Sequence, residues 1–98
     1  MSDAVPSPSV SEEARPHFRR GVRLTESPAH GGWVLLAPER VFKPDAIAVE
    51  ILRRCTGEAT LAGIVDDLAA TFAAPRERIL ADVTLLLSGL GEKRLVDW

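Results

Sequence analysis

The stretch Leu35-Leu36-Ala37-Pro38-Glu39-Arg40-Val41-Phe42 decides the fold predicted for this chain. Two short apolar runs flank a Pro-Glu pair, which is the pattern of two strands joined by a tight turn. A helix signal follows at once, because Asp45 is a favoured N-cap residue. The second strand therefore leads directly into helical sequence and leaves one edge uncovered, and such an edge can pair with another peptide.

A further strand precedes this pair. Val22 and Leu24 alternate with Arg23 and Thr25, as in a strand that is buried on one face. Residues 27–32 supply turn chemistry, with one proline and two glycines, and residues 33–36 resume as a strand. With the third, short strand at residues 40–43, the pattern predicts a small three-stranded antiparallel sheet.

The remainder of the chain has the periodicity of three helices. The first begins at Asp45, carries Ile47, Ala48 and Ile51 at helical spacing, and ends near Gly57. Thr60 caps the second, and Pro75 suits the first turn of the third. Residues 95–98 either add a short strand or pack across the helices. The predicted core consists of Leu24, Leu35, Ile51, Leu52, Ile64, Leu68, Val83, Leu86 and Leu90.

The predicted fold class is α+β, with a small three-stranded antiparallel N-terminal sheet followed by three helices, in a winged helix-turn-helix-like arrangement. A chain of 98 residues is enough for one domain. Residues 1–17 contain three prolines and no apolar period, so we expect a disordered N-terminal tail there. Residues 18–98 are expected to form the domain.

Composition narrows the class of protein. With 12 basic and 14 acidic residues the formal net charge is −2, and this disfavours a nucleic-acid partner. The single cysteine, Cys55, excludes an internal disulfide and favours a reducing cytoplasm. The chain start lacks a signal-peptide pattern, and no apolar run approaches membrane-spanning length, so we expect a cytoplasmic protein without a membrane partner.

The sequence offers little for catalysis or for a metal ion. His17 and His30 are the two histidines, and neither has metal-ligand spacing to a cysteine. Asp66 and Asp67 are adjacent on a predicted helix and point about 100° apart, so their carboxylates do not converge. Cys55 continues an apolar stripe, which favours a buried residue over a nucleophile. We therefore expect a non-enzyme with no catalytic residue, metal or cofactor.

Two function classes fit a winged-helix shape. A small DNA-binding transcriptional regulator would use residues 75–90 as its recognition helix and present Arg76 and Arg78 to DNA. The same helix carries the acidic Asp82, and Leu85 lies off its core stripe. An apolar residue flanked by acid suits a peptide groove better than a phosphate contact, so peptide binding is the preferred interpretation and the regulator is the alternative.

The ordered set of motifs resembles the PqqD family, the peptide chaperones of pyrroloquinoline quinone biosynthesis. The resemblance extends from about residue 19 to residue 96. The matching residues are Leu35-Leu36-Ala37-Pro38-Glu39, Asp45, Ile51-Leu52, Thr56-Gly57-Glu58, Ile64-Val65, Leu68, Asp82-Val83, Leu87 and Leu90.

The resemblance implies a winged helix-turn-helix that binds a ribosomal precursor peptide, PqqA, and presents it to a radical S-adenosylmethionine enzyme, PqqE. The iron–sulfur chemistry then belongs to that enzyme, since a chain with one cysteine cannot hold such a cluster. Whether the pathway makes this quinone or another modified peptide stays open at this point. A homodimer also stays open, because the Gly31-Gly32 turn could act as a hinge for strand exchange.

The precursor is expected to add as a strand along residues 40–43, with the outer flank of the third helix as the second wall. Val41 and Phe42 point to opposite faces, so only one of them can line the groove. Arg40 and Lys43 either attract an acidic leader or protect an ordinary strand edge, and Asp82 either contacts peptide or serves as a structural cap. The predicted peptide-binding residues are Arg40, Val41, Phe42, Lys43, Asp82, Leu85 and Leu86.

Overall fold

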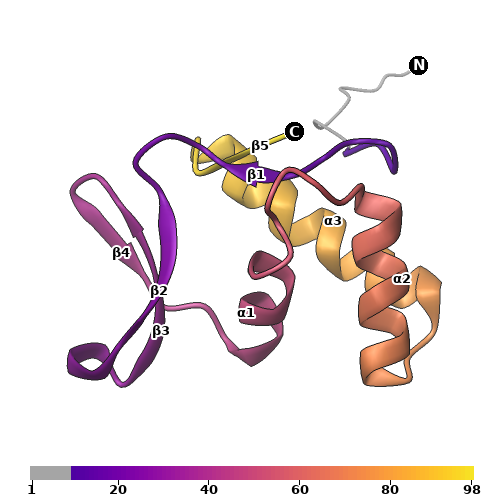
Figure 1. The fold of residues 1–98 in the computed structure, drawn as a ribbon, viewed down its shortest axis with the longest axis horizontal. Coiled ribbons are helices and arrows are strands. Elements are labelled where there is room, and N and C mark those ends of the chain that lie inside the picture. Colours follow the sequence, from indigo (N-terminus) through magenta and orange to yellow (C-terminus); the bar gives the residue numbers. More distant parts are fainter. Residues whose placement is uncertain (1–9) are drawn as a thin grey trace, which may run out of the picture.

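The computed structural model describes residues 10–98 and contains two small antiparallel sheets and three helices (Figure 1). The larger sheet has the order β2 (Arg23–Ser27), β3 (Gly32–Ala37) and β4 (Arg40–Phe42), and η1 (Pro28–His30) lies between the first two strands. The helices are α1 (Ala46–Leu52), α2 (Leu61–Phe72) and α3 (Arg76–Glu92). A two-stranded sheet pairs β1 (His17–Phe18) with β5 (Val96–Asp97). The predicted α+β fold with three helices is confirmed, and the winged-helix arrangement is compatible with it.

The turn between β3 and β4 follows from its two residues. Pro38 has a fixed negative φ, whereas Glu39 has a φ of 64°. A positive φ at the third turn position after a proline is the type II pattern. Ala37 and Arg40 are paired across this turn, so β4 folds back on β3 through a loop of only Pro38 and Glu39. The predicted hairpin is confirmed, and the tight turn fixes the register of β4.

Side-chain caps start the first two helices as predicted. The Asp45 carboxylate accepts a hydrogen bond from the Ala48 N–H at 2.8 Å, and the Thr60 hydroxyl oxygen accepts one from the Gly63 N–H at 3.1 Å. The first helix is shorter than the sequence suggested, because it ends at Leu52 and residues 53–55 continue as tighter turns. Gly57, with a φ of 85°, then redirects the chain toward α2.

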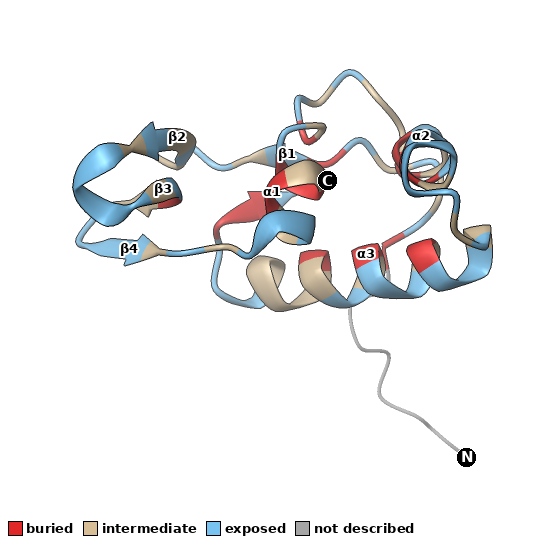
Figure 2. Cartoon of the chain, turned by 90° about the horizontal axis from the view of Figure 1, so that it is seen from below, coloured by how far each residue is buried: buried red, intermediate tan, exposed pale blue. Residues whose placement is uncertain are grey.

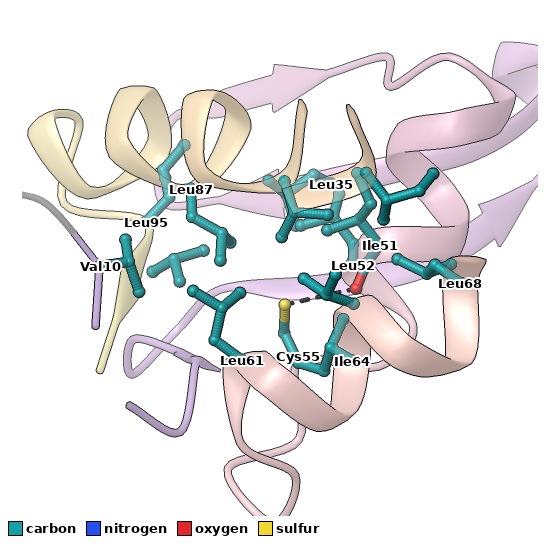
Figure 3. Close-up of a cluster of buried hydrophobic side chains, with 14 residues drawn as sticks. Val10, Leu35, Ile51, Leu52, Cys55, Leu61, Ile64, Leu68, Leu87 and Leu95 are labelled. Atoms are coloured by element: carbon teal, nitrogen blue, oxygen red, sulfur yellow. Dashed lines mark hydrogen bonds between the residues drawn. The ribbon is translucent and has the colours of Figure 1, made fainter. Parts of the chain in front are cut away.

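Residues 10–17 pack on the folded domain, which corrects the expectation that the tail extends to residue 17. Val10 is buried in the same cluster as Leu61 and Leu95 (Figure 3). Residues 1–9, the rest of that predicted tail, lie outside the described residues. The chain therefore joins the core well before the expected boundary at residue 18.

Backbone hydrogen bonds hold this N-terminal segment. The carbonyl oxygens of Glu12 and Ala14 accept from the N–H groups of Ala62 and Leu61 at 3.0 and 2.8 Å. These donors belong to the first turn of α2, where a helix leaves its N–H groups without an internal partner. Backbone hydrogen bonds do not require regularly spaced apolar residues. The sequence pattern of residues 10–17 therefore did not indicate them.

Arg76 adds a side-chain link to the same region. Its Nη2 lies 2.6 Å from Glu12 Oε1, and its Nε lies 2.5 Å from Asp66 Oδ1. One guanidinium thus connects the N-terminal segment, α2 and the first turn of α3.

The core lies among the three helices, and Val10, Leu35 of β3 and Val96 of β5 complete it (Figure 3). The larger sheet extends to one side of the helices and is mostly exposed (Figure 2). Three predicted core residues, Leu24, Leu86 and Leu90, are partly buried at its margin, because β2 is an edge strand and the two leucines flank the central stripe of α3. The remaining predicted core residues are buried, namely Leu35, Ile51, Leu52, Ile64, Leu68 and Val83.

Candidate peptide-binding groove

β4 presents an open backbone edge. In a hairpin closed by a two-residue turn, the flanking pair exchanges hydrogen bonds and the next pair exchanges none. Ala37 and Arg40 are the flanking pair, and Leu36 and Val41 are the next. The N–H and C=O of Val41 therefore point away from β3, and no strand within residues 10–98 pairs with this side of β4.

The two faces of β4 differ sharply. Phe42 is paired with the buried Leu35 and packs against the core cluster. Val41 is paired with Leu36 on the other face, and its side chain is 49% exposed. The structure thereby decides which residue turns toward the helices: it is Phe42, while Val41 offers its backbone to the edge and its side chain to solvent.

Arg40 joins β4 to the far end of α3. Its Nη2 donates to the carbonyl oxygen of Lys93 at 3.3 Å, and its guanidinium carbon lies 5.5 Å from the ring centroid of Phe42. Carbonyls at a helix C-terminus carry partial negative charge, which favours a cation there. The lysine in the predicted set, Lys43, is exposed just after the strand and has no ion-pair partner among residues 10–98.

A groove continues from the end of β4 along α3. On one wall are Asp45, Ile47 and Ala48, from the cap and first turn of α1, with Ile51 deeper in. The facing wall is made by Asp82, Leu85 and Leu86 of α3. Figure 2 shows β4 leading directly into α1, which lies against α3. We call this cleft the α1–α3 groove.

The predicted α3 residues take distinct places in this groove. Leu85 is 76% exposed, whereas Leu86 is partly buried and contacts the core. The Asp82 carboxylate has no hydrogen bond or ion pair within residues 10–98, so it does not serve as the structural cap that the sequence had left open.

Sequence reasoning missed the α1 side of the groove. Ile47 and Ala48 follow the apolar spacing of α1 and were placed with its core stripe, yet Ile47 is 55% exposed. The available signal was position: both lie in the first turn of a short helix that is separated from an edge strand by three residues. The structure brings Ile47 together with Asp82 and Leu86, while the β4 side chains lie before the groove and not in it.

Residues 32–96 match the family model described as Coenzyme PQQ synthesis protein D (PqqD). This chain belongs to the PqqD family. A PqqA binding protein of Bradyrhizobium diazoefficiens is 49% identical over 85 residues, covering 87% of this chain and 82% of the relative. Another, from Xanthomonas axonopodis pv. citri, is 45% identical over 87 residues, covering 89% and 95%.

Solved structures agree with the family. The chain is similar to the solution structure of the PqqD truncation of Methylobacterium extorquens PqqCD, a stand-alone recognition element for ribosomally synthesised, modified peptides. The TM-score is 0.79 with 35% identity, covering 96% of this chain and 100% of the other. The crystal structure of PqqD from Xanthomonas campestris gives a TM-score of 0.58 with 42% identity, covering 92% and 100%.

The PqqD family is a family of recognition proteins, so the chain is not an enzyme, as the sequence predicted. The side chains once weighed for chemistry have structural roles. Burial raises the pKa of Cys55 to about 12, and its thiol donates to the Ile51 carbonyl oxygen at 3.4 Å, so its predicted burial is confirmed. Asp66 and Asp67 pair with different arginines, Arg76 and Arg54.

The side chains of the two histidines considered for chemistry make hydrogen bonds to residues close to them in the sequence. The Ser27 hydroxyl and His30 Nδ1 are 2.9 Å apart within the η1 turn, and His17 Nδ1 donates to the Arg15 carbonyl oxygen at 2.9 Å. Within residues 10–98, no three His, Cys, Asp or Glu side chains gather as a metal site. The helices in the described part of the chain are all too short or too polar to cross a bilayer.

Of the two arginines that a DNA-binding helix would present, Arg76 is already engaged within the protein. Arg76 is held between Glu12 and Asp66, so its charge is already matched by two carboxylates. Hydrogen bonds to both carboxylates raise the pKa of Arg76, which remains a structural cation. Arg78 borders an apolar pocket instead of a basic face.

Proposed function

We propose that this PqqD-family chain binds the ribosomal precursor peptide PqqA as an added strand on β4 and presents it to the radical S-adenosylmethionine enzyme PqqE. The named relatives are PqqA binding proteins, and the similar solution structure is a peptide recognition element. Both support the peptide as the ligand. The step belongs in the cytoplasm, where the lone Cys55 stays reduced.

The observation that carries the proposal is the outward-pointing backbone of Val41. An extended peptide gains affinity from main-chain hydrogen bonds when it joins a sheet edge, and gains specificity from pockets for alternate side chains. The β4 edge supplies the main-chain hydrogen bonds, and the α1–α3 groove supplies the pocket for side chains. Of the predicted binding residues, those on β4 therefore hold the peptide backbone, and Asp82, Leu85 and Leu86 contact its side chains.

Charge along β4 suits an acidic leader segment. Arg40 and Lys43 lie on the strand and just after it, and neither has a carboxylate partner among residues 10–98. Unpaired cations on an edge strand also discourage unwanted strand pairing, so the two roles are compatible. A peptide that brings acidic residues to this edge would be selected over a neutral one.

Presentation follows from where the peptide lies. A strand added outside β4 keeps its outer backbone edge in solvent, so residues beyond the paired segment remain accessible to a second protein. The chain itself supplies orientation and no chemistry. A ternary complex of this chain, PqqA and PqqE is therefore expected, and pull-down of PqqE should be stronger when the peptide is present.

The decisive experiment replaces Val41 with proline. This change removes the N–H that points to the free edge, while the ladder between β3 and β4 does not use it. Losing one backbone hydrogen bond is expected to weaken binding of labelled PqqA by about fivefold or more in fluorescence anisotropy.

Glu26→Pro is the matched control on the opposite edge. Glu26 is paired with Trp33, which lies two residues before Leu35 on β3 and directs its backbone groups to the same side, toward β4. The Glu26 N–H therefore points out of the sheet. Peptide affinity should survive Glu26→Pro. Equal weakening by both prolines would mean that the sheet as a whole was disturbed, and no weakening by Val41→Pro would rule out pairing with β4.

A further inference from the structure

A separate apolar pocket lies where the three helices meet. Its volume is about 200 Å³, and it is enclosed by the first turn of α1, the last turn of α2 and the first half of α3. Ile47 and Phe72 stand at its mouth, with exposed fractions of 55% and 43%. We call it the three-helix pocket; it is lined by Ile47, Ile51, Leu68, Phe72, Ala74, Arg78, Ile79, Asp82 and Val83.

This pocket is continuous with the α1–α3 groove. Ile47, Ile51 and Asp82 line both, so an apolar path runs from the end of β4 past Leu85 to Phe72. Among residues 10–98, five large apolar side chains are exposed, and three of them, Ile47, Phe72 and Leu85, lie along this path. Exposed apolar side chains that gather on one line mark a binding surface more strongly than scattered ones.

Two charges border the pocket without partners. Arg78 and Asp82 are four residues apart on α3, a spacing at which opposite charges commonly pair. Neither side chain has a hydrogen bond or ion pair within residues 10–98. They are therefore available to a ligand, and Arg78 complements an acidic residue next to an apolar one.

We propose that the three-helix pocket binds one bulky apolar side chain of the precursor peptide, at a residue that precedes the segment paired with β4. We take the peptide to run antiparallel to β4, as the strands of the larger sheet do to one another. β4 runs toward α1, so a peptide paired antiparallel to it comes from the α1 side, and its earlier residues lie over the α1–α3 groove. An acidic residue beside the apolar one faces Arg78. This inference rests on the proposed function.

The test uses Phe72→Ala, which opens the mouth of the pocket at a side chain that is already partly exposed. Trp33→Ala is the matched control, because Trp33 is an aromatic residue of similar exposure, 36%, that lies outside both cavities. Arg78→Glu tests the charge at the pocket. Arg20→Glu is its control, because Arg20 is an exposed loop residue. The probe is synthetic PqqA together with single alanine variants at each of its apolar residues.

Phe72→Ala is expected to weaken PqqA binding on the order of tenfold, and Trp33→Ala to leave it unchanged. One alanine variant of the peptide, upstream of the paired segment, should lose a similar factor. Combining that variant with Phe72→Ala should add little further loss, because both changes remove the same contact. Arg78→Glu should weaken binding more than Arg20→Glu.

The outcomes separate this inference from the proposed function. Suppose that Val41→Pro weakens binding, and that the effect of Phe72→Ala adds fully to the effect of every alanine variant of the peptide. The pocket is then not a peptide subsite, and strand addition stands. If the unaltered chain does not bind PqqA at all, the proposed function fails and the pocket assignment with it. Folding of each variant is followed by circular dichroism, and Arg78→Glu provides a surface change that leaves the core untouched.

Discussion

The guanidinium of Arg40 donates a hydrogen bond to the main-chain oxygen of Lys93, which ties the first residue of β4 to the residue that ends α3. The bond bridges β4 and the C-terminal end of α3 at the Arg40 end of the strand.

Arg40→Ala is expected to lower the free energy of unfolding by about 0.5–1.5 kcal/mol, the usual contribution of one such hydrogen bond. Its clearer effect should be on β4 itself, whose amides should exchange with solvent faster relative to those of β3. Hydrogen-exchange NMR measures this. Arg23→Ala, at an exposed position of β2, is the control, and the same exchange pattern in both variants would contradict a tethering role for Arg40.

Leu85→Glu should separate binding from folding. Because Leu85 is 76% exposed, a carboxylate there is expected to change stability by less than about 0.5 kcal/mol. The same carboxylate would lie at the groove beside Asp82, so PqqA affinity should fall markedly in an anisotropy titration. Ala70→Glu, at an exposed position of α2 that lines neither the α1–α3 groove nor the three-helix pocket, should bind normally. Normal binding by Leu85→Glu would exclude this flank of α3 from the peptide contact.

Leu68→Ala tests the core. Leu68 is 1% exposed on α2, and truncation of a buried leucine costs about 2–5 kcal/mol. Urea titration should show that loss, whereas Leu85→Ala should show almost none. A cost for Leu68→Ala below about 0.5 kcal/mol would mean that the apolar stripe of α2 is not the core.

Cys55 makes stability depend on pH at the alkaline end. Its thiol pKa rises from an ordinary value of 9.0 to about 12 in the folded chain. The unfolded chain then loses its thiol proton first, so stability is complete below pH 9 and decreases between pH 9 and 12. The expected slope is about 1.4 kcal/mol per pH unit from this group.

Comparison with Cys55→Ala isolates the cysteine from other groups that titrate there. The stability difference between the two proteins should shrink from pH 8 to pH 10 by about that amount. A constant difference across this range would show that the thiol is accessible to water in the folded chain.

Local rules made much of the fold predictable. Asp45 and Thr60 are residues whose side chains satisfy helix N–H groups next to them, so their caps could be inferred without any tertiary contact. The Pro38-Glu39 turn is likewise encoded by its own residues. The buried stripes of α2 and α3 followed from spacing alone, because a helix with one apolar face must cover it.

What sequence reasoning missed depends on neighbours distant in the chain. The spacing of Ile47 shows that it lies on the apolar side of α1. Only the placement of α2 and α3 shows that they leave the Ile47 side chain exposed at a pocket. Val10 joins the core through a segment held by backbone bonds. The choice between Val41 and Phe42 needed the register of β4 on β3, which a period of two cannot supply.

Pairing of β1 with β5 has a consequence for how this domain can be attached to other proteins. It brings residues 17–18 next to residues 96–97, near the C-terminus and away from the first turn of α1 (Figure 1). A tether at either end therefore leaves the strand edge and both cavities uncovered. The similar solution structure is a truncation of a longer chain, PqqCD. This geometry allows the same recognition domain to work alone or as a module of a larger polypeptide.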